Sequence, residues 1–309
     1  GGDTVLQMHL HGLNVLIQVH AHKAAASAAE DKEAAEAARQ EAEEAKQAAE
    51  AAQKAAEAAQ KGMSLLAGKE GEIIALPDNP NHRPMPASLF TNASDSLIQA
   101  LGVSEGIPSA LCAYLYETDG KQILFDSGNG VEDSQLLPLL EARGITPQDV
   151  DFIFITHLHG DHIGGLLKNG EAVFSEAKLY INNQELQAWK AMPEERNAQV
   201  RQMIQAYGER LIAFDVKEAL PCEIQPIAAY GHTEGHTVYR IGDKLIAGDI
   251  MHGVALQIEN TDICARFDGN LEQSAQSRKD LIEFAKREGL VMYGMHFPEP
   301  HYIDFKTEK

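Results

Sequence analysis

The segment 154–165 reads FITHLHGDHIGG, and it constrains the fold more than any other part of the chain. It continues 152–156, an unbroken apolar, β-branched and aromatic run that is typical of a strand buried on both faces. Histidines two residues apart on extended chain point to the same side, and Gly160 lets the chain turn back toward them. One strand end therefore presents four metal-binding side chains: His157, His159, Asp161 and His162.

Four such side chains are too many for one tetrahedral ion that keeps a position open, so two ions sharing them is the simplest interpretation. A second ion needs further ligands, and the sequence offers one beyond each of three other apolar runs: His232 after 224–229, Asp249 after 244–248 and His296 after 291–294. Taken singly, a histidine after a strand is usually a hydrogen-bonded loop residue, and an aspartate after glycine is usually a turn residue. Their shared position at strand ends favours the ligand role.

From about residue 71 the sequence pattern is typical of an α/β protein. Apolar runs predict strands at 121–128, 177–182, 223–229 and 291–294, and helical spacing predicts helices at 134–144 and 272–289. The segment 237–249 predicts a hairpin that turns at Gly242-Asp243. Strands in runs with helices between them predict two sheets packed together with helices outside.

Residues 23–61 are nearly all Ala, Glu, Lys, Gln and Arg, and they predict one helix about 58 Å long. Alanine recurs in a four-three alternation that Met63 and Leu66 continue, which defines an alanine seam with heptad spacing: Ala35, Ala38, Ala42, Ala45, Ala49, Ala52, Ala56 and Ala59. The seam fits a rigid spacer or a close-packed helix pair that makes a homo-oligomer. A solvated helix without a partner fits equally well.

The first 62 residues differ in composition and sequence pattern from the rest. Gly1-Gly2 resembles the remnant of a cleaved tag, and Gly62-Met63-Ser64 resembles a junction before an original start. We therefore expect 1–62 to be an engineered or fused segment. The predicted organisation has three parts: a strand or hairpin-like segment at 1–22, the alanine-rich helix at 23–67 and one domain at 71–309.

The tetrapeptide HLHG also occurs at 9–12, where alternating side chains bring four histidines to one face: His9, His11, His20 and His22. A hairpin pairing 9 with 22 and 11 with 20 makes a four-imidazole site, but it centres the turn on Val15-Leu16. Gly12-Leu13-Asn14 is the better turn signal, and no carboxylate follows. We expect a solvent-facing strand there rather than a native metal site.

The net charge of −20 argues against nucleic acid as a partner and gives no reason to expect an anionic membrane. No apolar run approaches the roughly 18 residues that span a bilayer, and residues 1–22 lack the features of a secretory signal. The three cysteines, Cys112, Cys222 and Cys264, form no CxxC pair and fit buried small hydrophobes. These features favour a cytoplasmic protein with a small-molecule partner, although a removed signal leaves secretion open.

The order of these motifs resembles the metallo-β-lactamase superfamily, and Asp126 in LFDSG matches the first of its motifs. The resemblance covers 71–305 and implies an αββα four-layer sandwich with two divalent ions at one edge. Zinc is the usual metal, and iron and manganese are alternatives. Asp249 and His162 separate the chain from class B β-lactamases, and it is similar to methyl parathion hydrolase-like proteins and related lactonases. After the last motif the sequence reads Phe-Pro-Glu299-Pro-His301, which differs from those relatives, so the resemblance does not define the substrate.

The same resemblance implies a division of labour among the candidate ligands: one ion on His157, His159 and His232, the other on Asp161, His162 and His296, and Asp249 as the bridge. A hydroxide shared by the two ions attacks a carbonyl carbon or phosphorus, and Asp161 carries a proton to the leaving group. Asp126 and Thr156 fix imidazole tautomers, and His236 with Thr233 braces the His232 loop. Asp126 also fits a simple turn cap.

Four further side chains are candidate substrate contacts: Trp189, Met251, His252 and Phe267. A lone tryptophan is more often a core residue. The predicted function is hydrolysis of a small neutral ester, lactone or phosphotriester. Three alternatives remain: a phosphodiesterase or nuclease of the same superfamily, an iron redox enzyme that would need a flavin partner domain, and a non-catalytic helical scaffold.

Overall fold

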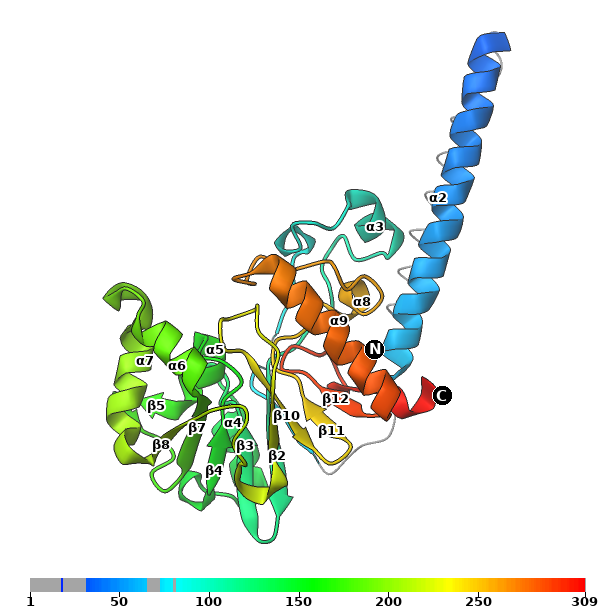
Figure 1. Ribbon diagram of the computed structural model, residues 1–309. Coiled ribbons are helices and arrows are strands. Elements are labelled where there is room, and N and C mark those ends of the chain that lie inside the picture. The colour runs from blue at the N-terminus through cyan, green and yellow to red at the C-terminus, as the bar shows by residue number, and fades with distance from the viewer. Residues whose placement is uncertain (1–17, 19–31, 66–72, 80–81, 309) are drawn as a thin grey trace.

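The computed structural model describes Gln18 and residues 32–65, 73–79 and 82–308. The described chain forms two β-sheets stacked face to face, with helices on both outer faces (Figure 1). This arrangement confirms the four-layer α/β architecture that the order of strands and helices predicted.

The first sheet has six strands in the order β1-β2-β3-β4-β7-β8. Their bounds are β1 Ile74–Pro77, β2 Cys112–Thr118, β3 Lys121–Phe125, β4 Phe152–Phe154, β7 Lys178–Asn182 and β8 Leu211–Phe214. The pairs from β3 to β8 are parallel, and the two pairs before them are antiparallel. The outer face packs against α4 Leu136–Ala142, α6 Asn183–Lys190 and α7 Glu194–Tyr207.

The second sheet has five strands in the order β13-β12-β11-β10-β9. Their bounds are β9 Gln225–Ala228, β10 Thr237–Ile241, β11 Lys244–Ile246, β12 Val291–Tyr293 and β13 Tyr302–Asp304. Its outer face packs against α3 Asp95–Ala100, α8 Val254–Gln257 and α9 Leu271–Glu288. The predicted hairpin is β10 with β11, which turns through Gly242 at φ 57°. A one-turn helix and a two-stranded ribbon complete the body: α5 Gly160–Ile163, β5 Leu167–Lys168 and β6 Glu171–Ala172.

Side chains alternate between the two faces of each strand, so successive residues of β4 enter different cores. Ile153 packs in the outer core beneath the helices, whereas Phe154 packs between the sheets. There Phe154 stacks on Tyr180, with 4.9 Å between the ring centroids, and approaches Tyr239 at 5.5 Å. The unbroken apolar sequence of this strand is therefore explained by burial on both faces.

The alanine-rich helix is α2, Lys32–Leu65, which projects away from the body (Figure 1). It contacts α3, α8 and β13, and Ala49 and Ala52 of the alanine seam are buried with Ala100. Part of the seam is therefore used within the chain.

The hairpin expected at 1–22, with its four histidines, lies outside the described residues except for Gln18. Gln18 is helical, which differs from the extended conformation expected for it. Among the described helices, none combines the length and the hydropathy that crossing a bilayer requires.

Candidate metal centre

The carboxyl ends of several strands meet at one edge of the sandwich. β3 and β4 are parallel, as are β11 and β12, and β9 runs in the direction of β11 because both are antiparallel to β10. The loops that follow these strands therefore emerge side by side. They carry all seven predicted ligands: His157, His159, Asp161, His162, His232, Asp249 and His296.

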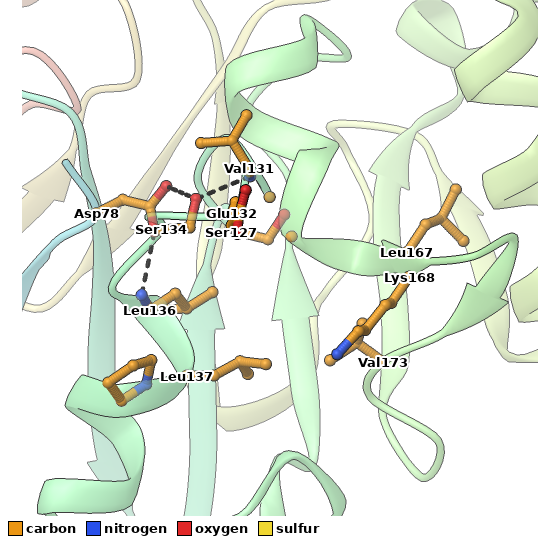
Figure 2. A pocket seen from close by; sticks show the side chains of 13 residues that line it. Asp78, Ser127, Val131, Glu132, Ser134, Leu136, Leu137, Leu167, Lys168 and Val173 are labelled. Atoms are coloured by element: carbon orange, nitrogen blue, oxygen red, sulfur yellow. Dashed lines mark hydrogen bonds between the residues drawn. The ribbon is translucent and has the colours of Figure 1, made fainter.

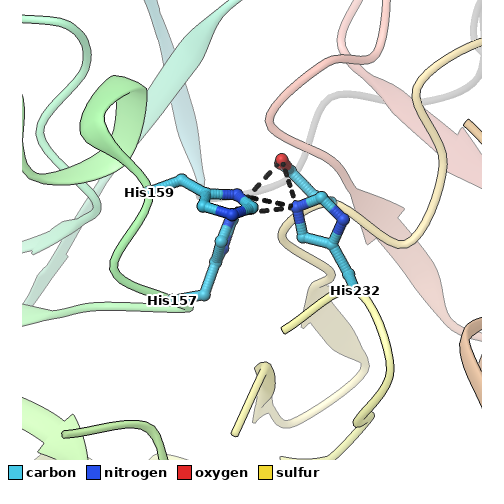
Figure 3. Close-up of side chains that lie close together, drawn as sticks. His157, His159 and His232 are labelled. Atoms are coloured by element: carbon cyan, nitrogen blue, oxygen red, sulfur yellow. Dashed lines mark hydrogen bonds and ion pairs between the residues drawn. The ribbon is translucent and has the colours of Figure 1, made fainter. Parts of the chain in front are cut away.

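Three imidazoles and one carboxylate form a first cluster: His157, His159, His232 and Asp249. Figure 3 shows how the three histidine rings converge. Nε2 of His232 lies 3.1 Å from Nδ1 of His159 and 3.2 Å from Nε2 of His157. Oδ2 of Asp249 lies 3.2 Å from Nε2 of His232 and 3.3 Å from Nε2 of His157. Ligands about 2.0–2.2 Å from a tetrahedral ion lie roughly 3.3–3.6 Å apart, so this spacing fits one divalent ion closely.

A second cluster lies on the other side of Asp249 and contains Asp161, His162 and His296. Oδ2 of Asp249 is 3.1 Å from Nε2 of His162 and 3.2 Å from Nε2 of His296. Oδ2 of Asp161 is 3.4 Å and 3.3 Å from the same two nitrogens. One carboxylate oxygen thus belongs to both clusters, so it is placed where it could be shared by two adjacent cations.

The donor set fits divalent cations for two further reasons. Oδ1 of Asp249 is buried and has no hydrogen-bond partner among the described residues, and a buried carboxylate oxygen is costly without one. Nδ1 of His159 and Nε2 of His232 lie about 3.1 Å apart, and only one hydrogen fits between two nitrogens at that distance. At least one of the two nitrogens therefore presents a lone pair, which a cation could accept. Cations between these atoms would satisfy all of them.

The buried charges shift one another's protonation strongly. Burial and the neighbouring His232 lower the pKa of His159 to about 3. Against the effect of burial, hydrogen bonds with Asp249 and Asp268 raise the pKa of His232 to about 9. Against burial again, the charge of Asp249 and a hydrogen bond with Asp161 raise the pKa of His296 to about 10. Without ions, protons therefore occupy part of the site.

Asp126 and Thr156 lie behind the clusters and hold two imidazoles. Nδ1 of His162 is 2.7 Å from Oδ2 of Asp126, which also accepts a 2.7 Å hydrogen bond from the Thr156 hydroxyl. Because that hydroxyl donates to Asp126, it accepts from Nδ1 of His157 at 2.9 Å. Both rings thereby turn Nε2 toward the clusters, a geometry compatible with the tautomer-fixing role predicted for Asp126 and Thr156.

His236 contacts both Asp249 and the base of the loop that carries His232. Its Nδ1 donates to the Ala229 carbonyl at 2.9 Å, and its Nε2 accepts from the backbone N–H of Asp249 at 3.0 Å. It therefore braces Asp249 and also joins the two ends of the 229–236 loop that carries His232, because the Ala229 N–H donates in return to the His236 carbonyl. Thr233, next to His232, donates to the buried carboxylate of Glu185 at 2.6 Å, which ties that loop to α6.

Asp268 is a site residue that sequence reasoning missed. Its Oδ1 lies 2.6 Å from Nδ1 of His232, and its Oδ2 lies 3.4 Å from the fully buried guanidinium of Arg278. The sequence carries no spacing signal for it, because it is 36 residues from its partner. His296 is similarly oriented by a backbone group, since its Nδ1 donates to the Ala110 carbonyl at 2.9 Å.

A cavity of about 550 Å³ opens over both clusters. His252 and Phe267 line it, with 5.4 Å between their ring centroids. Trp189 lines an adjoining cavity of about 570 Å³ and approaches His159 edge-on at 5.7 Å. Met251 is fully buried in the core and lines neither cavity, which corrects the expectation that it contacts substrate.

A further hollow of about 440 Å³, shown in Figure 2, is built around the buried carboxylate of Asp78. Its oxygens accept hydrogen bonds from the Ser134 hydroxyl and from the backbone N–H groups of Gln135 and Leu136. Asp78 therefore caps the first turn of α4. All its polar contacts among the described residues serve the fold.

Comparisons with known proteins agree with this geometry. The family model of the metallo-beta-lactamase superfamily matches residues 112–286. A hydroxyacylglutathione hydrolase of Xanthomonas euvesicatoria pv. vesicatoria (strain 85-10) is 28% identical over 168 residues, 54% of this chain and 53% of that protein. The chain thus matches about half the length of this relative.

Many solved structures share the fold, among them a hydrolase and a lactonase. The hydrolase AbOPH of the beta lactamase superfamily has 26% identity and a TM-score of 0.66, and the match covers 76% of this chain and 90% of that one. AidC, a dizinc quorum-quenching lactonase solved with a product, has 24% identity and a TM-score of 0.59, with coverage of 63% and 74%.

Proposed function

Since the chain belongs to the metallo-beta-lactamase superfamily, we propose that it binds two divalent ions, preferably Zn²⁺, and hydrolyses small neutral esters, lactones or phosphotriesters. The observation that carries the proposal is the position of Asp249. Its Oδ2 lies 3.1–3.3 Å from an imidazole nitrogen of four histidines, two in each cluster. A single buried oxygen among four imidazoles has no comparable purpose in a purely structural core.

Divalent ions held by these residues would supply an acidified water molecule and Lewis-acid polarisation of the bond to be cleaved. The protein residues divide the remaining tasks. Asp249, tied through its backbone to His236, would be a ligand of both ions. The side chain of Asp161 is partly exposed, at 34%, and it lines the cavity. It is therefore placed to pass a proton to the leaving oxygen of a bound substrate.

The cavity walls favour a small neutral substrate. Met85 and Phe267 supply apolar surface, and no lysine or arginine is among the described residues that line the cavity over the clusters. In the adjoining cavity Arg196 is accompanied by Glu185 and Glu234. A phosphodiester backbone would find little positive charge here, which argues against the nuclease alternative. The structural similarity to a dizinc lactonase supports lactones as the first class to test.

The proposal is tested with zinc-loaded protein against a γ-lactone, an aryl acetate, a neutral aryl phosphotriester, a glutathione thioester and an aryl phosphodiester. We expect turnover of at least one of the first three. Asp249→Asn should lose metal and activity together, whereas Asp280→Asn, an exposed aspartate on α9, should lose neither. Turnover of the phosphodiester alone would favour the alternative function. Zinc content well below two per chain at saturation would contradict the dinuclear site.

A further inference from the structure

His82 faces the cavity over the metal centre but belongs to neither cluster. Its ring lines the same cavity as Asp161 and His296, and the charges of both residues act on its pKa. It therefore lies toward the second cluster, where the Asp161 side chain is partly exposed. His82 comes from the chain between β1 and α3, which contributes none of the predicted ligands.

The ring is held by the chain segment 107–112. Nε2 of His82 lies 2.8 Å from the Ser109 hydroxyl oxygen. Met85 and Ile107 exchange backbone hydrogen bonds of 2.8 and 2.7 Å, which fix this segment beside that of His82. The residue after Ser109 is Ala110, whose carbonyl orients His296. Two consecutive residues thus position an imidazole inside the second cluster and another imidazole beside it.

We propose that His82 is a further substrate-contacting residue. The Ser109 hydroxyl donates to Nε2, and the opposite nitrogen, Nδ1–H, donates a hydrogen bond to an oxygen of the bound substrate. This inference rests on the proposed function. It names the group that the substrate must present: a hydrogen-bond acceptor oxygen close to the bond whose leaving oxygen receives a proton from Asp161.

The protonation of the ring is consistent with this role. Burial and the charge of His296 lower the pKa of His82, so the ring is neutral at pH 7 and carries one N–H. When Ser109 donates to Nε2, that N–H is on Nδ1. Among the described residues, Nδ1 of His82 has no hydrogen-bond partner, in contrast to Nδ1 of His162, His232 and His296.

Two substitutions separate the two ring nitrogens. Glutamine places its amide near the position of Nε2, so His82→Gln keeps the contact with Ser109 and removes the donor to the cavity. Asparagine places its amide near Nδ1, so His82→Asn restores that donor. We expect His82→Gln to lower kcat/KM by about 100-fold, as for the loss of a donor to a transition-state oxygen, and His82→Asn to recover most of the loss. Arg83→Gln, an exposed neighbour, is the matched control.

The measurement is kcat and KM on whichever substrate the wild-type protein hydrolyses, with metal content determined for each variant. His82→Gln indistinguishable from Arg83→Gln at full metal content would overturn this inference and leave the proposed function intact. Equal losses in His82→Gln and His82→Asn would overturn it too, because they would show a structural role. Absence of turnover in the wild-type protein would instead overturn the proposed function itself.

The tautomer gives a readout independent of activity. In zinc-loaded protein with ¹⁵N-labelled histidine, the His82 signals are identified by their loss in His82→Asn. We expect a protonated Nδ1 and an unprotonated Nε2, and a shift toward Nε2–H in Ser109→Ala. An Nε2–H ring in the wild-type protein would contradict the assignment, because Nδ1 would then have no hydrogen to donate.

Discussion

Four imidazoles of the metal centre share one arrangement, in which Nε2 faces the clusters and Nδ1 is tied to a fixed partner. The partners are chemically varied: the Thr156 hydroxyl for His157, the Asp126 carboxylate for His162, the Asp268 carboxylate for His232 and the Ala110 carbonyl for His296. Each ring is therefore oriented by folding, before any ion binds. Such partners typically raise metal affinity by about 10–100-fold each.

Asp126→Asn tests this arrangement at a single residue. The substitution removes the charge and places an amide N–H₂ where Oδ2 accepts hydrogen bonds from His162 and Thr156. The amide hydrogens would then face the ring N–H of His162 and the hydroxyl hydrogen of Thr156, and neither hydrogen bond could form. We expect metal affinity of the second cluster to fall about 10–100-fold, measured by competition with a coloured chelator. Asp149→Asn, an exposed aspartate, serves as the control. Unchanged affinity in Asp126→Asn would show that His162 is oriented by other contacts.

Metal binding should release protons at neutral pH. In the metal-free fold the pKa values of His232 and His296 are about 9 and about 10, above the ordinary 6.5, so both rings are protonated at pH 7.5. A cation can bind Nε2 only after that proton leaves, so metal affinity should rise with pH up to about 10. Calorimetric titration in two buffers of different ionisation enthalpy measures the release. Binding heats that are independent of the buffer would contradict these pKa values.

The same shifts set the pH dependence of stability in the metal-free protein. Both folded pKa values are raised, so the stabilisation they contribute is fully present below pH 6.5 and is lost as pH rises through 9 to 10. The Tm of the chelator-treated protein should therefore fall across that range. The zinc-loaded protein, in which these protons are displaced, is the control and should show a smaller fall.

At the scale of elements, the turn after β11 sets the position of the Asp249 carboxylate. Gly248 has φ 57°, and a Cβ on it would lie 2.4 Å from Nε2 of His236, the atom that accepts from Asp249 N–H. Gly242, in the preceding hairpin, has the same φ but would meet nothing within 4 Å. Substitutions at the two glycines therefore distinguish the effect of backbone strain, which both share, from the effect of crowding against His236, which only Gly248 would produce.

Gly242→Ala should cost about 1–3 kcal/mol of unfolding free energy, the ordinary penalty for a left-handed residue, with metal content unchanged. Gly248→Ala carries the same strain and also displaces His236, so we expect a larger loss of stability together with weaker metal binding. Denaturant unfolding and metal analysis measure the two effects. Identical results for the two variants would show that His236 moves aside without consequence for Asp249.

The helix α9 contributes one buried cation that ties together two loops of the site. Arg278 is fully buried and donates to the carbonyls of Ile250, Thr261 and Ile263, and it lies 3.4 Å from Asp268. Ile250 directly follows Asp249. The guanidinium thus connects the loop that carries Asp249 to the carboxylate that orients His232.

Arg278→Met should therefore lower the unfolding free energy by about 3–5 kcal/mol, because it leaves Asp268 without its cation and several carbonyls without donors. Lys279→Met, at the exposed neighbouring position, should change it by less than about 0.5 kcal/mol. Chemical unfolding of both zinc-loaded variants makes the comparison. A small effect of Arg278→Met would mean that water replaces the guanidinium in the folded protein.

At the scale of the whole molecule, α2 is attached to the body through small side chains. Ala49 and Ala52 are buried with Ala100 of α3, whereas the adjacent Ala48 is exposed. Ala49→Glu should weaken the docking of α2 by about 1–3 kcal/mol through overpacking, and Ala48→Glu should not. Limited proteolysis within α2 reports the docking. We expect metal content to be unchanged in both, because neither residue belongs to the metal centre.

Two predictions about organisation concern this helix as well. Homo-oligomerisation through the alanine seam stays a prediction, and the burial of Ala49 and Ala52 within the chain leaves less of the seam for a second copy. A separate domain over 71–309 also stays a prediction, and α2 contacts α3, α8 and β13 of that part. Sedimentation of the Ala49→Glu variant would show whether the seam also joins copies of the chain.

The sequence by itself determined the layered fold and the place where the candidate ligands gather. Apolar runs mark strands, and parallel strands end at one edge, so residues that follow such runs meet without any knowledge of the intervening loops. The tertiary structure alone decided what holds those residues. Asp268, Ala110 and His82 reach the site across long sequence separations, and a carbonyl or carboxylate that orients an imidazole needs no particular spacing from it. Met251 shows the converse, because a neighbour in sequence is turned into the core by the local backbone.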